Sequence, residues 1–321
     1  MGVISPIANH KEVMKLAFDF YFAGSQCEEA TQVMIKLNAN VLKSYINEQK
    51  QISEWFNRKD KGWTGKLLID NGAFTVHRQG GEINIDEYIQ WLNTNDKYID
   101  YAIALDNIPG KWGRKRTYEE LKNSPIITWQ NYVYMCEKCN NPFKLLPVFH
   151  QGEEFKYLKQ IVNHKINGEY VKYICISGNK ELTNKQREKW YAECYTVIKE
   201  SPNPDVKVHC LGSATISNAV KFPFTSMDAT SWIMTGANGG ILTNFGVVKV
   251  SKESAGDVDN IKNCPQAVVD FVNKQCDQYG ITLEQLQESY KNRMCMNVHY
   301  LYNTSQKTNY NGKLIKVNKL F

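Results

Sequence analysis

The feature that most limits how this chain can fold is a repeated alternation of short apolar runs with stretches of helical periodicity. Eight apolar runs precede residue 251: 16–23, 66–69, 101–105, 144–149, 170–176, 206–211, 224–227 and 240–250. Short strands that alternate with helices indicate parallel β-α-β units. Eight such units in this length predict an α/β protein with a (β/α)₈ TIM barrel. An open, doubly wound parallel sheet is the structural alternative.

The stretches between these runs are expected to be helices, and the first of them, 28–47, has the pattern of a single helix. After residue 250 the pattern changes. Residues 265–279 are amphipathic, and Thr282 to Gln285 has the S/T-x-x-E/Q form of a capping box that starts another helix reaching about Tyr302. We therefore expect two units, a barrel over 1–250 and a helical extension over 251–321 packed on it.

Length and charge exclude several classes of protein. The 321 residues carry a net charge of +6, which permits a nucleic-acid partner without requiring one. No apolar run approaches the roughly 20 residues that a transmembrane helix needs, so we expect no membrane partner. The N-terminus lacks the long apolar segment of a signal peptide, and the nine cysteines are an odd number. Both features favour a cytoplasmic protein with reduced thiols.

Polar residues follow most of the apolar runs, and in a barrel the strand ends would bring them to one rim. They are Asp70, Asp106, His150, Gln151, Ser177, His209 and Asp228. Catalytic residues of TIM barrels lie at this rim. The three carboxyl groups matter most, because neighbouring carboxylates drive one another's pKa values apart. One can then act as an acid while another acts as a nucleophile, as in displacement at a sugar carbon.

Each of these residues also has a simpler structural interpretation. An Asp at a strand end is often only the N-cap of the next helix. His209 lies inside an apolar run and can equally be a hydrogen-bonded core histidine. Phe74, four residues after Asp70, can stack on a planar base, which contributes about 1–3 kcal/mol, or can be an ordinary core residue.

A basic run follows Asp106. It comprises Lys111, Arg114, Lys115 and Arg116, and the barrel topology would place it on the active face. Cations of this kind supply most non-specific affinity for nucleic acid by contacting phosphates. The alternative is a solvated surface loop.

The cysteines do not form a clear metal motif. Cys295 and His299 have i, i+4 spacing on an expected helix, and Cys264 or Cys276 could complete a tetrahedral zinc site. Buried thiols are the simpler interpretation, so we expect no metal and no other cofactor.

Five segments, in order, resemble motifs of the tRNA-guanine transglycosylase superfamily. They are 70–74 (DNGAF), 104–106 (ALD), 148–152 (VFHQG), 208–212 (VHCLG) and 226–232 (SMDATSW). The last segment is most similar to the S-x-D-S-x-S-W form of the phage and bacterial branch, which inserts 7-deazaguanine bases into DNA. The resemblance spans about 16–245.

This resemblance implies a (β/α)₈ barrel that exchanges a base without breaking the nucleic-acid strand. By position, Asp228 resembles the nucleophile that attacks C1′ and forms a covalent glycosyl intermediate, and Asp70 resembles the acid/base. Asp106 resembles the carboxylate that contacts the Watson–Crick edge of the base. The remaining substrate-binding residues that the resemblance implies are Phe74, Gln151, Ser177, Gly178, His150 and His209.

The chain departs from the tRNA enzymes in two places. Residues 294–299 (MCMNVH) do not reproduce their C-x-C-x-x-C zinc motif with its later His, and 230–232 (TSW) replace the Leu-Pro-Thr-Arg segment after the nucleophile. We therefore expect a phage-type enzyme that exchanges guanine in DNA for a 7-deazaguanine of the preQ0 type, with or without an accessory protein. The target nucleotide would be flipped out or single-stranded.

Three alternatives remain. The first is the same exchange on tRNA, and the second is a non-catalytic nucleic-acid-binding barrel. The third is an unrelated small-molecule barrel enzyme, which the absence of a strand-end lysine for Schiff-base chemistry disfavours.

Overall fold

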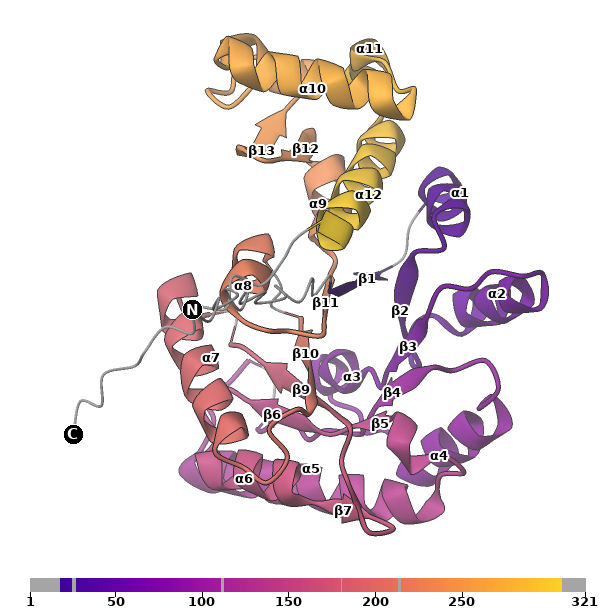
Figure 1. Cartoon of the computed structure of the whole chain (residues 1–321), viewed down its shortest axis with the longest axis vertical. Helices are drawn as coiled ribbons and strands as arrows, with labels where there is room; N and C mark the ends of the chain where they lie inside the picture. The colour runs from indigo at the N-terminus through magenta and orange to yellow at the C-terminus, as the bar shows by residue number, and fades with distance from the viewer. Residues whose placement is uncertain (1–17, 25–26, 111–112, 180, 213–214, 308–321) are drawn as a thin grey trace, which may run out of the picture.

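The computed structural model describes residues 18–24, 27–110, 113–179, 181–212 and 215–307, in which strands and helices mostly alternate (Figure 1). The strands are β1 (Asp19–Ala23), β2 (Asn40–Ser44), β3 (Leu67–Asp70), β4 (Tyr101–Ile103), β5 (Leu145–Leu146), β6 (Val148–His150), β7 (Lys165–Ile166), β8 (Glu169–Tyr170), β9 (Tyr173–Ser177), β10 (Lys207–Leu211), β11 (Ser226–Ala229), β12 (Gly240–Thr243) and β13 (Gly246–Lys249). The α-helices are α1 (Glu28–Lys36), α2 (Gln49–Asp60), α3 (Ala73–Gln79), α4 (Ile85–Thr94), α5 (Tyr118–Lys138), α6 (Phe155–Asn163), α7 (Asn184–Lys199), α8 (Ile216–Lys221), α9 (Ser231–Ala237), α10 (Gln266–Tyr279), α11 (Leu283–Glu288) and α12 (Tyr290–Lys307).

Nine parallel strands of the described chain form one curled sheet in the order β5-β4-β3-β2-β1-β11-β10-β9-β6. Its two end strands, β5 and β6, are separated in sequence only by Pro147, which has no N–H to donate to a ladder. β5 pairs with β4 and β6 pairs with β9, so the two ends of the sheet meet at one chain segment. The sheet is therefore a nearly closed parallel barrel, and the predicted α/β class is confirmed.

The prediction that residues 28–47 form a single helix is wrong for the second half of this range. Helix α1 ends at Lys36, Asn38 adopts a left-handed conformation (φ 49°), and residues 40–44 form β2 between β1 and β3. This strand was hard to predict because Lys43 interrupts its apolar run. The lysine is fully buried, and an ion pair compensates its charge.

The eighth predicted strand, 240–250, does not join the barrel. It forms an antiparallel hairpin of β12 and β13 around a turn in which Gly246 has φ 104°. A two-strand hairpin needs only such a short turn, whereas a parallel partner needs a crossover connection. The hairpin shares an apolar core with α10 and α12, which includes Ile241, Val272 and Met296. β2 supplies the barrel strand that the hairpin does not.

Three helices accompany the hairpin in the C-terminal part of the described chain. The capping box predicted at Thr282 and Gln285 is confirmed, but α11 is short and α12 follows it as a separate helix. α12 packs against α9 and α1 of the barrel (Figure 1). The buried amide of Asn297 donates to Trp232 O (3.1 Å) and accepts from Leu242 N (2.7 Å), which ties α12 to α9 and to β12. No helix in the described ranges is long and apolar enough to cross a membrane.

Alternate strand residues fill the inside of the barrel. This inner layer contains Tyr21, Leu42, Leu68, Ile103, Leu146, Val148, Tyr173 and Cys175. Their sequence neighbours, such as Phe22 and Ile69, belong to the larger core between the sheet and the helices. Because side chains alternate along a strand, Asp70 faces the same side as Leu68. Polar side chains thus lie above the inner layer at the carboxyl ends of the strands.

Candidate active site

The predicted polar residues lie at the carboxyl ends of the barrel strands. Asp70, His150 and Ser177 are the last residues of β3, β6 and β9. Asp228 is the last but one residue of β11, and Asp106 follows β4 by three residues. Because all of these strands are parallel, their carboxyl ends form one rim.

The three acids do not have the simpler role of helix N-caps. The N-caps of the helices that follow β3, β4 and β11 are Gly72, Thr117 and Thr230. An N-cap lies immediately before the first helical turn, where its side chain can reach the exposed N–H groups. Capping therefore does not explain why acids are present at these strand ends.

The carboxyl group of Asp70 has a pKa well above its usual range. Burial raises its pKa to about 7, and the nearby charges of Asp106 and Asp228 add to the increase. The influence of these two charges means that the three acids are close enough to interact. Its side chain keeps partial access to solvent. A carboxyl group with a pKa near 7 can both donate and accept a proton at neutral pH.

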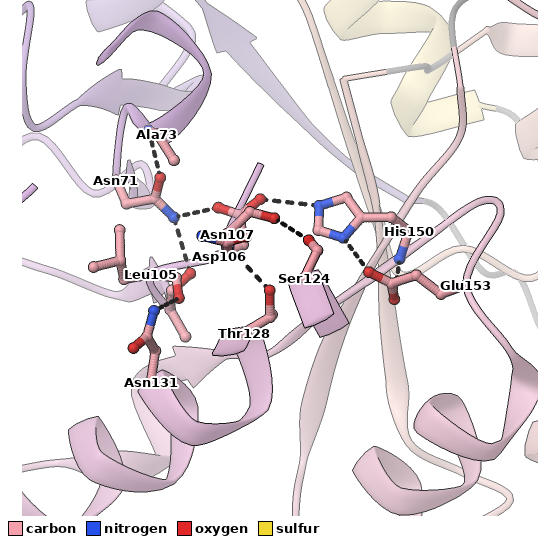
Figure 2. Close-up of polar contacts among 11 residues, drawn as sticks. Asn71, Ala73, Leu105, Asp106, Asn107, Ser124, Thr128, Asn131, His150 and Glu153 are labelled. Carbon is pink, nitrogen blue, oxygen red and sulfur yellow. Dashed lines mark hydrogen bonds and ion pairs between the residues drawn. The ribbon is translucent and has the colours of Figure 1, made fainter. Parts of the chain in front are cut away.

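Asn71 connects the end of β3 to Asp106. Its Oδ1 accepts a hydrogen bond from Ala73 N (2.7 Å), which orients the side-chain amide. Its Nδ2 then donates to Ala104 O and to Asp106 Oδ1, both at 2.9 Å (Figure 2). The position of one Asp106 oxygen is therefore fixed from β3.

His150 holds the other oxygen of Asp106. Its Nε2 lies 2.9 Å from Asp106 Oδ2, and its Nδ1 lies 3.0 Å from Glu153 Oε1 (Figure 2). Burial opposes a charged imidazole, but hydrogen bonds to the two carboxylates raise the pKa of His150 to about 10. Burial likewise opposes ionisation of Asp106, but the hydrogen bonds from His150 and Asn71 lower its pKa. At neutral pH the pair is an imidazolium beside a carboxylate.

Three polar residues on one face of α5 hold the backbone around Asp106. Ser124 Oγ donates to the carbonyl of the residue after Asp106 (2.6 Å), and Thr128 Oγ1 accepts from the N–H of that same residue (2.9 Å). Asn131 Nδ2 donates to the carbonyl of the residue before Asp106 (3.1 Å; Figure 2). The three are spaced four and three positions apart, so they share a helix face. Asp106 is thus carried by a backbone that a long helix fixes on both sides.

Replacing His150 with Ala should reduce the free energy of unfolding by about 3–5 kcal/mol at pH 6, because it leaves two carboxylates close together without their cation. The folded pKa of about 10 lies above the value of about 6.5 for unfolded His. The stabilisation is therefore complete below pH 6.5 and is lost as the pH rises to 10. Urea unfolding of the wild type and of His150→Ala at pH 6 and pH 9.5 measures the difference in their free energies of unfolding. An equal difference at both pH values would contradict this account.

Asp228 is held through one of its oxygens. Its Oδ1 accepts a hydrogen bond from Gly212 N (2.6 Å) and lies 3.2 Å from His209 Nε2. Asp228 is 6 % exposed, and His209 is completely buried in β10. His209 is thus a hydrogen-bonded core histidine that also contacts a site carboxylate, which combines the two interpretations of its sequence position.

Gln151 lies next to the rim and bridges two loops. Its Oε1 accepts a hydrogen bond from Asn179 N (3.0 Å), just beyond β9. Ser177 is paired with His150 across β9 and β6, and Gly178 is buried. The Gln151 amide therefore fixes the segment that contains the other two predicted base contacts.

Phe74 and the basic run lie on the loops and helix that follow β3 and β4. Phe74 is in α3 and is 54 % exposed, which is unlike a core residue. Lys111 lies outside the described residues. Arg114 forms an ion pair at the start of α5, and Lys115 and Arg116 are exposed.

The zinc candidates are not brought together. Within the described ranges, no group of three or more His, Cys, Asp or Glu residues is arranged to hold a metal ion. His299 instead stacks on Tyr279, with ring centroids 4.3 Å apart. Cys276 and Cys295 are buried, and Cys264 is partly exposed.

Two charged residues near the rim are not predicted from the sequence. Lys43 is a strand-end lysine, contrary to the expectation that there is none. It is fully buried and donates to Gly24 O (2.5 Å) and Glu48 Oε1 (3.0 Å), so it is not placed to form a Schiff base with a substrate. Glu153 lies three residues after His150, and this spacing is the signal that could have indicated it.

Compared with models of known protein families and with curated protein sequences, the chain has no match. Function therefore has to be inferred from the rim residues and their chemistry.

Proposed function

We propose that this protein is a transglycosylase that exchanges guanine in DNA for a 7-deazaguanine derivative. The proposal includes a (β/α)₈ barrel, in which β5 and β6 count as one strand interrupted at Pro147. Counted in this way, eight parallel strands are each followed by a helix.

The observation that carries the proposal is the difference between Asp70 and Asp228. The pKa of Asp70 is raised to about 7, which suits a group that gives up a proton and later takes one. Asp228 is held through Oδ1, and no described residue donates a hydrogen bond to its Oδ2. An acid/base and a fixed carboxylate nucleophile are the two groups that a retaining displacement at a sugar carbon needs.

The exchange then takes two displacements at C1′ of the target nucleotide. In the first, Asp228 forms an ester bond to C1′, the bond from C1′ to N9 of guanine breaks, and Asp70 gives its proton to the departing base. In the second, Asp70 takes the proton from N9 of the incoming 7-deazaguanine, and that nitrogen attacks C1′. The ester bond breaks, Asp228 is released, and the phosphodiester strand stays intact throughout.

Asp106, which His150 holds in its ionised form, suits recognition of both bases. A carboxylate whose pKa is lowered accepts hydrogen bonds, and the Watson–Crick edge of guanine offers N–H donors. 7-Deazaguanines have the same edge, because they differ from guanine only at position 7 and its substituent. One carboxylate can therefore bind the leaving base and the incoming base.

The choice of DNA rather than tRNA rests on the resemblance of 226–232 to the DNA-modifying branch. C1′ of a stacked, paired nucleotide is not accessible to groups at the rim of a barrel, so the target must be flipped out or single-stranded. The exposed Lys115, Arg116 and Phe74 suit contacts with phosphates and an unpaired base.

Base exchange with radiolabelled guanine tests the proposal. The purified protein is incubated separately with duplex DNA, single-stranded DNA and bulk tRNA, and label in the polymer is counted. Label in DNA alone supports the proposal, and mass spectrometry of nucleosides then identifies the 7-deazaguanine that is accepted. Label in tRNA alone would assign the protein to the tRNA branch. Binding of DNA without exchange of guanine or of any 7-deazaguanine would favour a non-catalytic barrel.

A further inference from the structure

The geometry points to His209 as the residue that positions Asp228 for attack, at the end of a buried hydrogen-bonded chain that starts at Tyr173. The inference rests on the proposed function, in which the Asp228 carboxylate is the nucleophile. His209 touches no reacting atom in this scheme and acts only through Asp228.

The chain runs across three neighbouring strands. Tyr173 of β9 has its hydroxyl 2.5 Å from Ser226 Oγ of β11. Ser226 Oγ is also hydrogen-bonded to Nδ1 of His209 in β10, and His209 Nε2 lies 3.2 Å from Asp228 Oδ1. Tyr173 is 4 % exposed, and Ser226 and His209 are completely buried. Because the network is buried this deep in the barrel, water does not replace any of its hydrogen bonds.

Only one direction of donation satisfies every hydrogen in the chain. The Tyr173 hydroxyl has Ser226 as its partner among the described residues, so it donates to Ser226 Oγ. The Ser226 hydroxyl then donates to Nδ1 of His209, which places the ring hydrogen on Nε2. The opposite direction would place the lone pair of Nε2 against the Asp228 carboxylate, which can only accept, and would leave the Tyr173 hydroxyl hydrogen without an acceptor among the described residues. His209 is therefore a neutral imidazole that donates from Nε2 to Asp228.

This donation has a geometric consequence for the nucleophile. His209 Nε2–H and Gly212 N–H both reach Oδ1 of Asp228, one from within β10 and the other from the residue that follows it. Two donors on one oxygen stop rotation of the carboxylate and leave Oδ2 as the atom that attacks C1′. Side chains behind a reacting group commonly set its orientation in this way.

Substitutions at His209 separate positioning from a structural role. His209→Leu should lower kcat for exchange about 100-fold with KM nearly unchanged, because a small misplacement of a reacting group has an effect of this size. His209→Gln keeps an N–H near the position of Nε2 and should recover about tenfold of that loss. Equal kcat values for the two folded variants would overturn the positioning role.

Two tyrosines of the inner layer give a matched pair of variants. Tyr173→Phe and Tyr21→Phe each remove one buried hydroxyl, and the Tyr21 ring also contacts His209 edge-on, with centroids 5.8 Å apart. The Tyr21 hydroxyl has no hydrogen-bond partner among the described residues. Tyr173→Phe should lower kcat several-fold, about tenfold at most, whereas Tyr21→Phe should leave it unchanged. An equal effect of both variants would contradict the proposed series of hydrogen bonds from Tyr173 to Asp228.

The tautomer of His209 can be measured on the wild-type protein without any substrate. Nitrogen-15 labelling of histidine, with His209 assigned through its contact with the Tyr21 ring, should show hydrogen on Nε2 and none on Nδ1. Hydrogen on Nδ1 would overturn the inference even if exchange is observed, and the proposed function would stand. Absence of base exchange by the wild-type protein would instead overturn the proposed function, and the positioning role with it.

Discussion

Replacing Asp228 with Asn should lower base exchange by about 10⁴-fold or more, because the amide has no anionic oxygen to form the ester with C1′. The change is nearly isosteric. The remaining carbonyl oxygen can still accept the hydrogen bonds from Gly212 and His209, so the fold should be preserved. Affinity for DNA should stay within a few fold of the wild type, because phosphate contacts supply most of it.

Exchange kinetics and a DNA-binding titration, made on the same preparation, check this expectation. Asp19→Asn is the matched control, since it makes the same chemical change at the opposite, amino end of the barrel. Asp19 bonds there to Lys66 (2.5 Å) and Asn40 (3.2 Å) and takes no part in the proposed reaction. Full exchange activity in Asp228→Asn would show that the nucleophile has been assigned to the wrong residue. Loss of both exchange and binding would show that Asp228 serves the fold or the DNA contact instead.

Replacing Asp70 with Asn should reduce exchange by about 10²–10⁴-fold and yet stabilise the folded protein above neutral pH. The folded pKa of Asp70 is raised from 3.8 to about 7. The folded state therefore binds the proton more tightly than the unfolded state does. Stability falls as the pH rises from about 4 to 7, because ionised Asp70 is partly buried and lies near two other acids. Asn resembles the protonated acid and escapes this loss.

Unfolding by urea at pH 5 and pH 8 separates the two effects on Asp70→Asn. At pH 5, which lies above the unfolded pKa, the variant should already be more stable by about 1–2 kcal/mol. At pH 8 the variant should be more stable by about 4 kcal/mol, which follows from the difference between the two pKa values. A variant that is no more stable at pH 8 would mean that Asp70 has an ordinary pKa. It could not then serve as a proton donor at neutral pH.

The order of strands and the place of the acids could largely be predicted from the sequence. Runs such as 66–69 and 206–211 consist of residues that suit a doubly covered parallel strand, and they become β3 and β10. Polar residues directly after such runs must lie at the carboxyl ends, because parallel strands all point the same way. Asp70 and Asp228 were placed by this argument, which needs no knowledge of tertiary contacts.

What could not be predicted depends on partners distant in sequence or hidden by burial. Lys43 makes β2 resemble a polar surface segment, and only the ion pair with Glu48 allows the strand to be buried. The apolar residues of 240–250 fit a barrel strand as well as a hairpin, and contacts with α10 and α12 decide between the two. Residues such as Ser124 and Thr128 are unexceptional on a helix, so their hold on the Asp106 backbone follows only from where α5 docks.

The pairing of β1 with β11 sets the moment at which the proposed nucleophile, Asp228, joins the other two acids. Tyr21 of β1 lies opposite Asp228 of β11 in the register of the sheet, so more than 200 residues of chain separate two adjacent strands. Contacts of such long sequence separation form slowly, because a large loop must close first. The ribosome must synthesise the chain past residue 229, the end of β11, before these two strands can pair. A nascent chain therefore presents Asp70 and Asp106 long before Asp228 joins them, and a shortened chain that ends before β11 would keep most of the barrel sequence without the carboxylate that we propose as the nucleophile.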